Sequence, residues 1–161
     1  VINIEIGDGT VVVPITANVT ATNAFQLTTP STGVDFGDVP RDTTAVRSLG
    51  GFTVIDDRTT LTGWFVNVSA NDFTGPSGAT ISKDQLGYVA TVVGGNSAGS
   101  APTAGKTAGA GAFGSALAAT TGNGTAASGA NYDLNLSFLA PVSAAAGSYT
   151  SSVTLTLVPA S

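Results

Sequence analysis

Aspartates are the only side chains in this sequence whose spacing suggests chemistry. Asp56 and Asp57 are adjacent, and Asp35 and Asp38 lie three residues apart. Such pairs could act as a general acid and base, or could supply oxygen ligands to calcium. Neither pair has the loop spacing that specifies a metal, and aspartates are common in turns and helix caps. We therefore interpret all four as turn residues.

The composition excludes the other common catalytic systems. The chain has no histidine and no cysteine, so neither a Ser–His nor a Cys–His nucleophile can be built. Gly105-Lys106-Thr107 is similar to the end of a phosphate-binding loop, but the upstream position that requires glycine is Ser100. We therefore predict that the protein is not an enzyme and that it uses no cofactor and no metal.

Length and charge limit the fold and the partners. The 161 residues are enough for one domain with a core. Only 9% of them are charged, and the net charge of -5 argues against nucleic acid as a partner. No run approaches the roughly 20 apolar residues of a membrane-spanning helix. A first residue other than methionine, Val1, suits a processed and exported protein, so we expect a secreted, cell-surface location.

The stretch from Phe52 to Phe73 shows the clearest strand pattern and holds the only tryptophan, Trp64. Trp64 and Val66 share one face of a strand, and Phe65 lies on the other. An alternating strand has one face in a core and one in water, so we predict a core hairpin in which Trp64 is buried. In the turn of this hairpin we expect Asp57 and Arg58 to form a local ion pair.

Similar alternation occurs along most of the chain and predicts an all-β fold. Runs of this kind lie at 1–6, 11–21, 25–30, 34–40, 86–93, 132–138 and 149–157. Pro14 lacks a ladder donor, which favours an edge position for the second run. About eight or nine short strands, with frequent turn residues and no helical pattern, predict an antiparallel β-sandwich, either immunoglobulin-like or jelly-roll-like.

Residues 94–129 differ from the rest because they are almost entirely Gly, Ala, Ser and Thr. Phe113 and Leu117 are their only bulky apolar side chains. The segment is either a loosely ordered surface loop or one that packs flat because its side chains are small. Small side chains bury little surface to offset the entropy of ordering. We therefore predict a long external insertion loop with few core contacts.

The order of four motifs resembles a known family. DFG at 35–37, FTVIDDR at 52–58, GWFVNVSANDF at 63–73 and GSYTSSVTLTL at 147–157 follow one another as in the WxL and WxL-like domains of exported Gram-positive surface proteins. The resemblance covers roughly residues 25–161. It departs from the family pattern at Val66, where the name-giving leucine is expected, and in the absence of a second Trp-x-Leu motif. It implies a sandwich fold, a cell-surface location and, more distantly, peptidoglycan binding.

Two functions fit these features. The first is a structural subunit that polymerises with copies of itself into an extracellular filament. The second is a WxL-like module that binds peptidoglycan without polymerising. Soluble sandwiches protect their sheet edges with charges, and this chain has few to place there, which favours the filament. Asn-x-Ser/Thr triplets that permit glycosylation lie at Asn18, Asn67, Asn123 and Asn135.

The N-terminal segment provides a hypothesis for how copies join. Ile2, Ile4 and Ile6 lie on one face of a short strand, and a Gly-Asp-Gly hinge at 7–9 separates it from the sandwich domain at 10–161. The three isoleucines could fill pockets along a neighbour's open sheet edge while the backbone completes its ladder. Alternatively, the segment folds back as an edge strand of its own sandwich.

Overall fold

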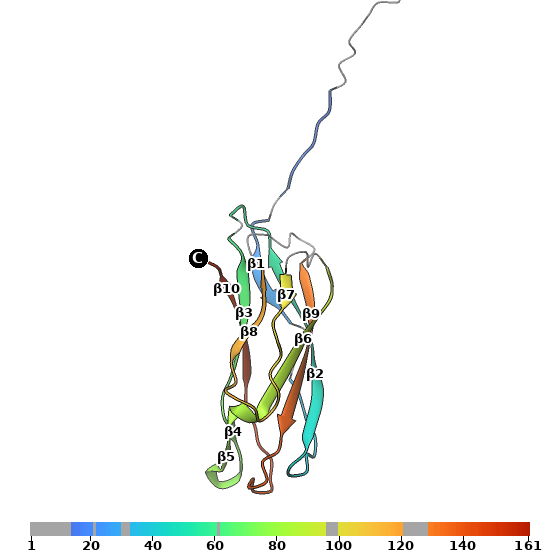
Figure 1. Cartoon of the computed structure of the whole chain (residues 1–161). Helices are drawn as coiled ribbons and strands as arrows, with labels where there is room; N and C mark the ends of the chain where they lie inside the picture. The colour runs from blue at the N-terminus through green and yellow to red at the C-terminus, as the bar shows by residue number, and fades with distance from the viewer. Residues whose placement is uncertain (1–13, 21, 30–32, 61, 96–99, 121–128) are drawn as a thin grey trace, which may run out of the picture.

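The computed structural model describes residues 14–20, 22–29, 33–60, 62–95, 100–120 and 129–161. Within these ranges the chain is an all-β protein, as the alternation predicted, built from two four-stranded antiparallel sheets that face each other (Figure 1). The first sheet contains, in spatial order, β1 (Phe25–Thr28), β2 (Thr44–Asp56), β9 (Ala130–Leu139) and β6 (Leu86–Gly95). The second contains β10 (Val153–Pro159), β3 (Trp64–Ala70), β8 (Ser115–Thr120) and β7 (Ser100–Pro102).

Short elements lie between these strands. A two-stranded ribbon of β4 (Phe73–Thr74) and β5 (Thr80–Ile81) extends from one end of the sandwich. Two single-turn 3-10 helices, η1 (Pro76–Gly78) and η2 (Lys83–Gln85), precede β5 and β6. In the described part of the chain, no helix is long and apolar enough to span a membrane.

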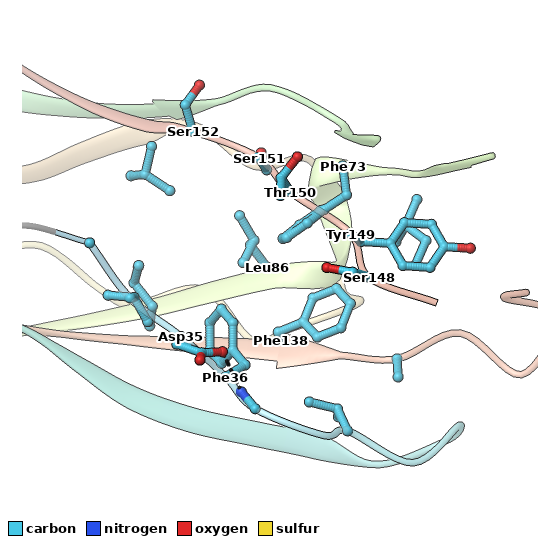
Figure 2. Close-up of a pocket in the computed structure, with 18 of the residues that line it drawn as sticks. Asp35, Phe36, Phe73, Leu86, Phe138, Ser148, Tyr149, Thr150, Ser151 and Ser152 are labelled. Atoms are coloured by element: carbon cyan, nitrogen blue, oxygen red, sulfur yellow. Dashed lines mark hydrogen bonds between the residues drawn. The ribbon is translucent and has the colours of Figure 1, made fainter. Parts of the chain in front are cut away.

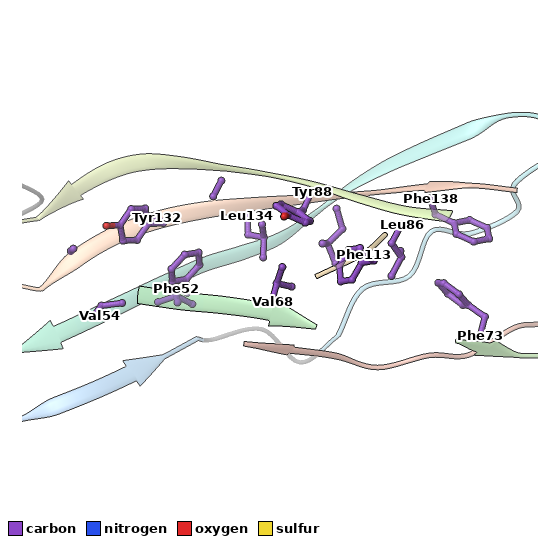
Figure 3. Close-up of a cluster of buried hydrophobic side chains, with 14 of the residues drawn as sticks. Phe52, Val54, Val68, Phe73, Leu86, Tyr88, Phe113, Tyr132, Leu134 and Phe138 are labelled. Atoms are coloured by element: carbon purple, nitrogen blue, oxygen red, sulfur yellow. The ribbon is translucent and has the colours of Figure 1, made fainter. Parts of the chain in front are cut away.

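The core forms where the alternating residues of the two sheets meet. Trp64 and Val66 of β3 are fully buried beneath β2 and β9, whose inward residues are also apolar except for Asp56 at the end of β2. Phe52 and Tyr132 are register partners on β2 and β9, and their rings stack with centroids 4.9 Å apart (Figure 3). Stacked cross-strand aromatic pairs of this kind stabilise a sheet beyond the area that they bury.

The predicted hairpin at 52–73 is wrong. β2 lies in one sheet and β3 in the other, so the residues between them cross from sheet to sheet. β2 pairs with β1 and β9, and β3 pairs with β8 and β10. Alternation predicted where these strands are but not which strands they pair with, because pairing depends on the sheet order of the whole chain.

The predicted loop at 94–129 is also wrong where the structure describes it. β7 and β8 both lie within it, and β8 is an inner strand of its sheet, paired with β3 on one side and β7 on the other. Phe113 is buried, and its ring meets the ring of Tyr88 edge-on at 5.5 Å. A run of small residues therefore completes a sheet, since backbone hydrogen bonds need no large side chain.

Two other segments were predicted as strands and are not. Residues 34–40 form no ladder, although they run beside the sandwich. Residues 14–20, the described part of the run at 11–21, also have no strand partner and are exposed to solvent. The last strand starts at Val153, four residues later than predicted.

Candidate functional site

A groove of about 1420 Å³ runs along one side of the sandwich, between the segment at 33–41 and the residues that lead into and begin β10 (Figure 2). Its apolar lining comes from both sheets and from the loop segment. The main apolar contributors are Leu27, Val34, Phe36, Leu49, Phe138 and Leu155. Because the lining includes two continuous chain segments, 33–41 and 144–155, the groove suits an extended chain.

The groove exists because β1 is much shorter than its neighbour β2. β1 pairs only with Thr53–Asp56, which leaves residues 44–52 of β2 without a described strand on that side. Residues 33–40 then pass in front of this gap without forming a ladder. On the opposite side, β10 is the edge of the second sheet. The two sheets are therefore open toward each other along this side.

The open edge of β10 carries backbone groups that bond to no other described residue, and its first residues, 153–155, line the groove. Asn71 donates its N–H to the carbonyl of Ser152 (3.1 Å), and Ala160 donates to the carbonyl of Gly63 (3.0 Å). In an antiparallel ladder alternate residues bond to the same neighbour, so the even-numbered residues of β10 face β3. Val153, Leu155 and Leu157 consequently direct their N–H and C=O groups to the open edge, where no described residue bonds to them.

The floor of the groove is aromatic. Phe138 lies at its centre, with the ring of Phe36 5.7 Å away and the ring of Phe73 4.9 Å away. Figure 2 shows these rings beside Leu86 and Tyr149. Asp35 is at the rim, and its carboxylate accepts the N–H of Gly37 (2.8 Å), as in an ordinary Asx turn. The site offers apolar contact and a sheet edge.

The N-terminal segment at 14–20 has complementary properties. It extends away from the sandwich (Figure 1), and Ile15 and Val19 are 90% and 91% exposed. Ile15, Ala17 and Val19 fall on one face of an extended chain. Large apolar side chains gathered on one exposed face are typical of contact surfaces, and residues 14–20 pair with no other described strand.

Asp57 anchors the base of this segment. Its carboxylate accepts hydrogen bonds from both the backbone N–H and the hydroxyl of Thr22, the latter at 2.7 Å. Its own N–H donates to the carbonyl of Ala24 (2.8 Å). The predicted ion pair between Asp57 and Arg58 is wrong, because Arg58 binds Asp56 instead.

The anchor predicts a measurable titration. The hydrogen bonds from Thr22, first from its backbone and then from its hydroxyl, hold the pKa of Asp57 below its ordinary value. These bonds are complete above the ordinary pKa and are lost as the pH falls through the lowered one. Carboxyl-detected NMR should therefore show a lowered pKa that Thr22→Val raises partway. An unshifted Asp57 in the unmodified protein would contradict the anchor.

The structure separates the residues that the sequence singled out. Trp64 and Val66 are core residues, and Phe65 is half-buried on the outer face of β3. Ile2, Ile4 and Ile6 lie outside the described residues, as does Asn123. Three triplet asparagines are described: Asn18 is exposed on the N-terminal segment, Asn135 is exposed on β9, and Asn67 is half-buried on β3.

The four aspartates do not form one site. Asp56 is not the turn residue that was predicted, because it is the fully buried last residue of β2 and binds Arg58. Asp57 anchors Thr22, Asp35 closes a turn, and Asp38 is exposed in the lining of the groove. In the described ranges, no three acidic residues gather as they would around a metal ion. The groove itself was not predicted. It depends on the short length of β1, and no pattern in the sequence near β1 indicates where that strand ends.

Comparison with known proteins adds no relative. Protein-family models, curated proteins and solved structures were all searched, and none matches this chain. The resemblance to WxL-like domains over residues 25–161 stays a prediction from sequence motifs.

Proposed function

We propose that this protein is a structural subunit that polymerises head-to-tail into an extracellular filament. In this proposal, the N-terminal segment of one copy adds as a strand to the groove of the next. One observation carries it: a single chain holds both an open sheet edge above an apolar groove and an exposed apolar segment of extended chain. An open sheet edge leaves backbone hydrogen-bonding groups unpaired, and an exposed apolar segment leaves apolar surface in water. Pairing the segment with the edge would remove both of these unfavourable exposures.

Head-to-tail growth follows from the difference between the two surfaces. The donated segment and the groove are different parts of the molecule, so a copy that has given its segment still has an empty groove. Such a contact repeats without limit unless it closes into a ring. Burying a large apolar side chain contributes about 1.5–3 kcal/mol, and Ile15 and Val19 together provide two such contributions per contact.

The peptidoglycan-binding alternative has less support. Binding of a glycan strand uses exposed aromatic side chains, and Trp64 is entirely buried in the core. The groove contains Phe36, Phe73 and Phe138, but these rings form its floor and leave the backbone edge of β10 unexplained. We therefore assign no wall-binding and no catalytic role to the site.

Truncation and complementation test the proposal. The full chain should form filaments visible by electron microscopy, whereas a chain lacking residues 1–20 should be a folded monomer by circular dichroism and light scattering. A peptide of residues 1–20 should bind the truncated monomer and raise its melting temperature. At 100 times its Kd, the peptide should add about 2.7 kcal/mol of stability.

A matched peptide provides the control. Replacing Ile15 and Val19 with asparagine in that peptide removes the apolar contacts and should abolish the stabilisation. Filaments formed equally well by the truncated chain would refute the proposal. If the full chain stayed monomeric and sedimented with purified peptidoglycan, the wall-binding alternative would replace it.

A further inference from the structure

We infer that residues 14–20 of one copy pair with β10 of the next in the antiparallel direction, with Ile15, Ala17 and Val19 turned into the groove. This inference rests on the proposed function and makes it specific, because it names the segment, the edge and the direction. β10 is seven residues long, and at about 3.3 Å per residue it spans roughly 23 Å. An extended chain over residues 14–20 covers that length.

The two strands have matching alternation. On β10, the backbone groups of Val153, Leu155 and Leu157 bond to no other described residue, and these three side chains pack against the core, whereas Thr154 and Thr156 are exposed. Residues directly opposite each other in a sheet point to the same side. Ile15, Ala17 and Val19 opposite this set would thus enter the groove, leaving the polar residues of the segment in water.

Pro14 distinguishes the two directions. In an antiparallel pair, opposite residues bond to each other, so the inward residues Ile15, Ala17 and Val19 would bond to the inward residues of β10. Pro14, which has no backbone N–H, would then face away from the ladder, so no carbonyl of β10 would lose a hydrogen bond. In a parallel pair the bonds shift to the residues on either side, and Pro14 would leave a carbonyl of β10 unpaired.

The place where the segment leaves the sandwich also favours antiparallel pairing with the next copy. Thr22 is bound to Asp57, in the connection between β2 and β3, and the end of β10 bonds to Gly63 in the same connection. The segment therefore leaves the end of the sandwich at which β10 finishes (Figure 1). Folding back onto its own β10 would place the two strands parallel. A copy stacked beyond that end in the same orientation would receive the segment antiparallel.

Cysteine cross-linking tests the direction, because the chain contains no native cysteine. One cysteine is placed at Thr16 or Asn18 on the segment, and the second is scanned over Ser152, which precedes β10, and Thr154 and Thr156 on β10. All five side chains are exposed. Opposite residues of this outward set lie about 4.5 Å apart between Cα atoms, which is within disulfide range. Filaments of each variant are oxidised and separated on non-reducing gels.

The antiparallel arrangement predicts which way the most efficiently cross-linked position on β10 shifts when the segment cysteine is moved. When the segment cysteine moves from Thr16→Cys to Asn18→Cys, the most efficient position on β10 should move two residues toward Ser152. The products should be ladders of multimers that collapse on reduction. A shift of two residues in the opposite direction would overturn the inferred direction. Disulfides confined to monomers would show that the segment folds back on its own chain.

Failure of the inference and failure of the proposed function give different results. Filaments that form normally but cross-link at none of these positions would overturn the assignment of the segment and leave polymerisation intact. Absence of filaments from the cysteine-free parent chain would overturn both.

Discussion

Replacing Arg58 with leucine should lower the free energy of unfolding by about 3–5 kcal/mol, the usual cost of removing one member of a buried ion pair. Asp56 is 0% exposed, and its two carboxylate oxygens accept hydrogen bonds from Arg58 Nε (2.7 Å) and Nη2 (3.0 Å). The same guanidinium lies 3.8 Å from the centre of the Phe25 ring and bonds to the carbonyl of Gly63. One side chain thus connects β1, β2 and the start of β3.

Chemical denaturation of matched variants measures this effect. The hydrogen bond to Asp56 raises the pKa of Arg58 above its ordinary value, so the guanidinium stays charged across the accessible pH range. Arg41→Leu removes an exposed cation and should change stability by less than about 0.5 kcal/mol. A double variant with leucine at 56 and 58 should be more stable than the single one, because no buried charge remains. A cost for Arg58→Leu equal to that of Arg41→Leu would contradict this account.

Replacing Trp64 with alanine should also cost about 3–5 kcal/mol, through lost burial and the cavity left behind. The indole is fully buried, and β3 is held between β8 and β10. Its Nε1 has no hydrogen-bond partner among the described residues, so the contribution of this side chain is mainly apolar contact. Trp64→Phe should therefore cost clearly less than Trp64→Ala.

Thermal melts of three variants test this second effect. Phe65→Ala, one residue along the same strand, removes a half-buried ring from the outer face and should destabilise less than Trp64→Ala. The unmodified protein should show blue-shifted emission that resists quenchers, as a buried indole does. Unchanged melting of Trp64→Ala would refute the core role of this residue.

The sequence predicted those strands whose large apolar side chains alternate. β3, β9 and much of β6 and β10 were placed correctly, because a half-buried strand must repeat every second residue. The start of β2 at Thr44 was missed because its first half contains exposed and charged residues. β8 was missed because, apart from Leu117, its Ala, Ser and Thr residues give little contrast between its two faces.

The candidate site was predictable only in part. Alternation at 11–21 identified one apolar face on this run, but a period of two does not indicate whether a sheet that covers such a face belongs to the same chain or to another copy. The donor segment was predicted at Ile2, Ile4 and Ile6, outside the described residues, whereas the described segment at 14–20 has the same pattern. The groove depends on strand lengths and sheet order, which are properties of the whole fold.

The anchor at Thr22 has a mechanical consequence for any fibre built in this way. Only one residue separates Thr22, which is held by Asp57, from Thr20 at the end of the donated segment. Two residues of chain span at most about 7 Å, so consecutive sandwiches would be nearly in contact. Bending at the junction would have to strain both the Thr22 anchor and the shared ladder. The fibre would thus behave as a stiff rod, in which force applied at one end is transmitted through hydrogen-bonded strands and not through slack linkers.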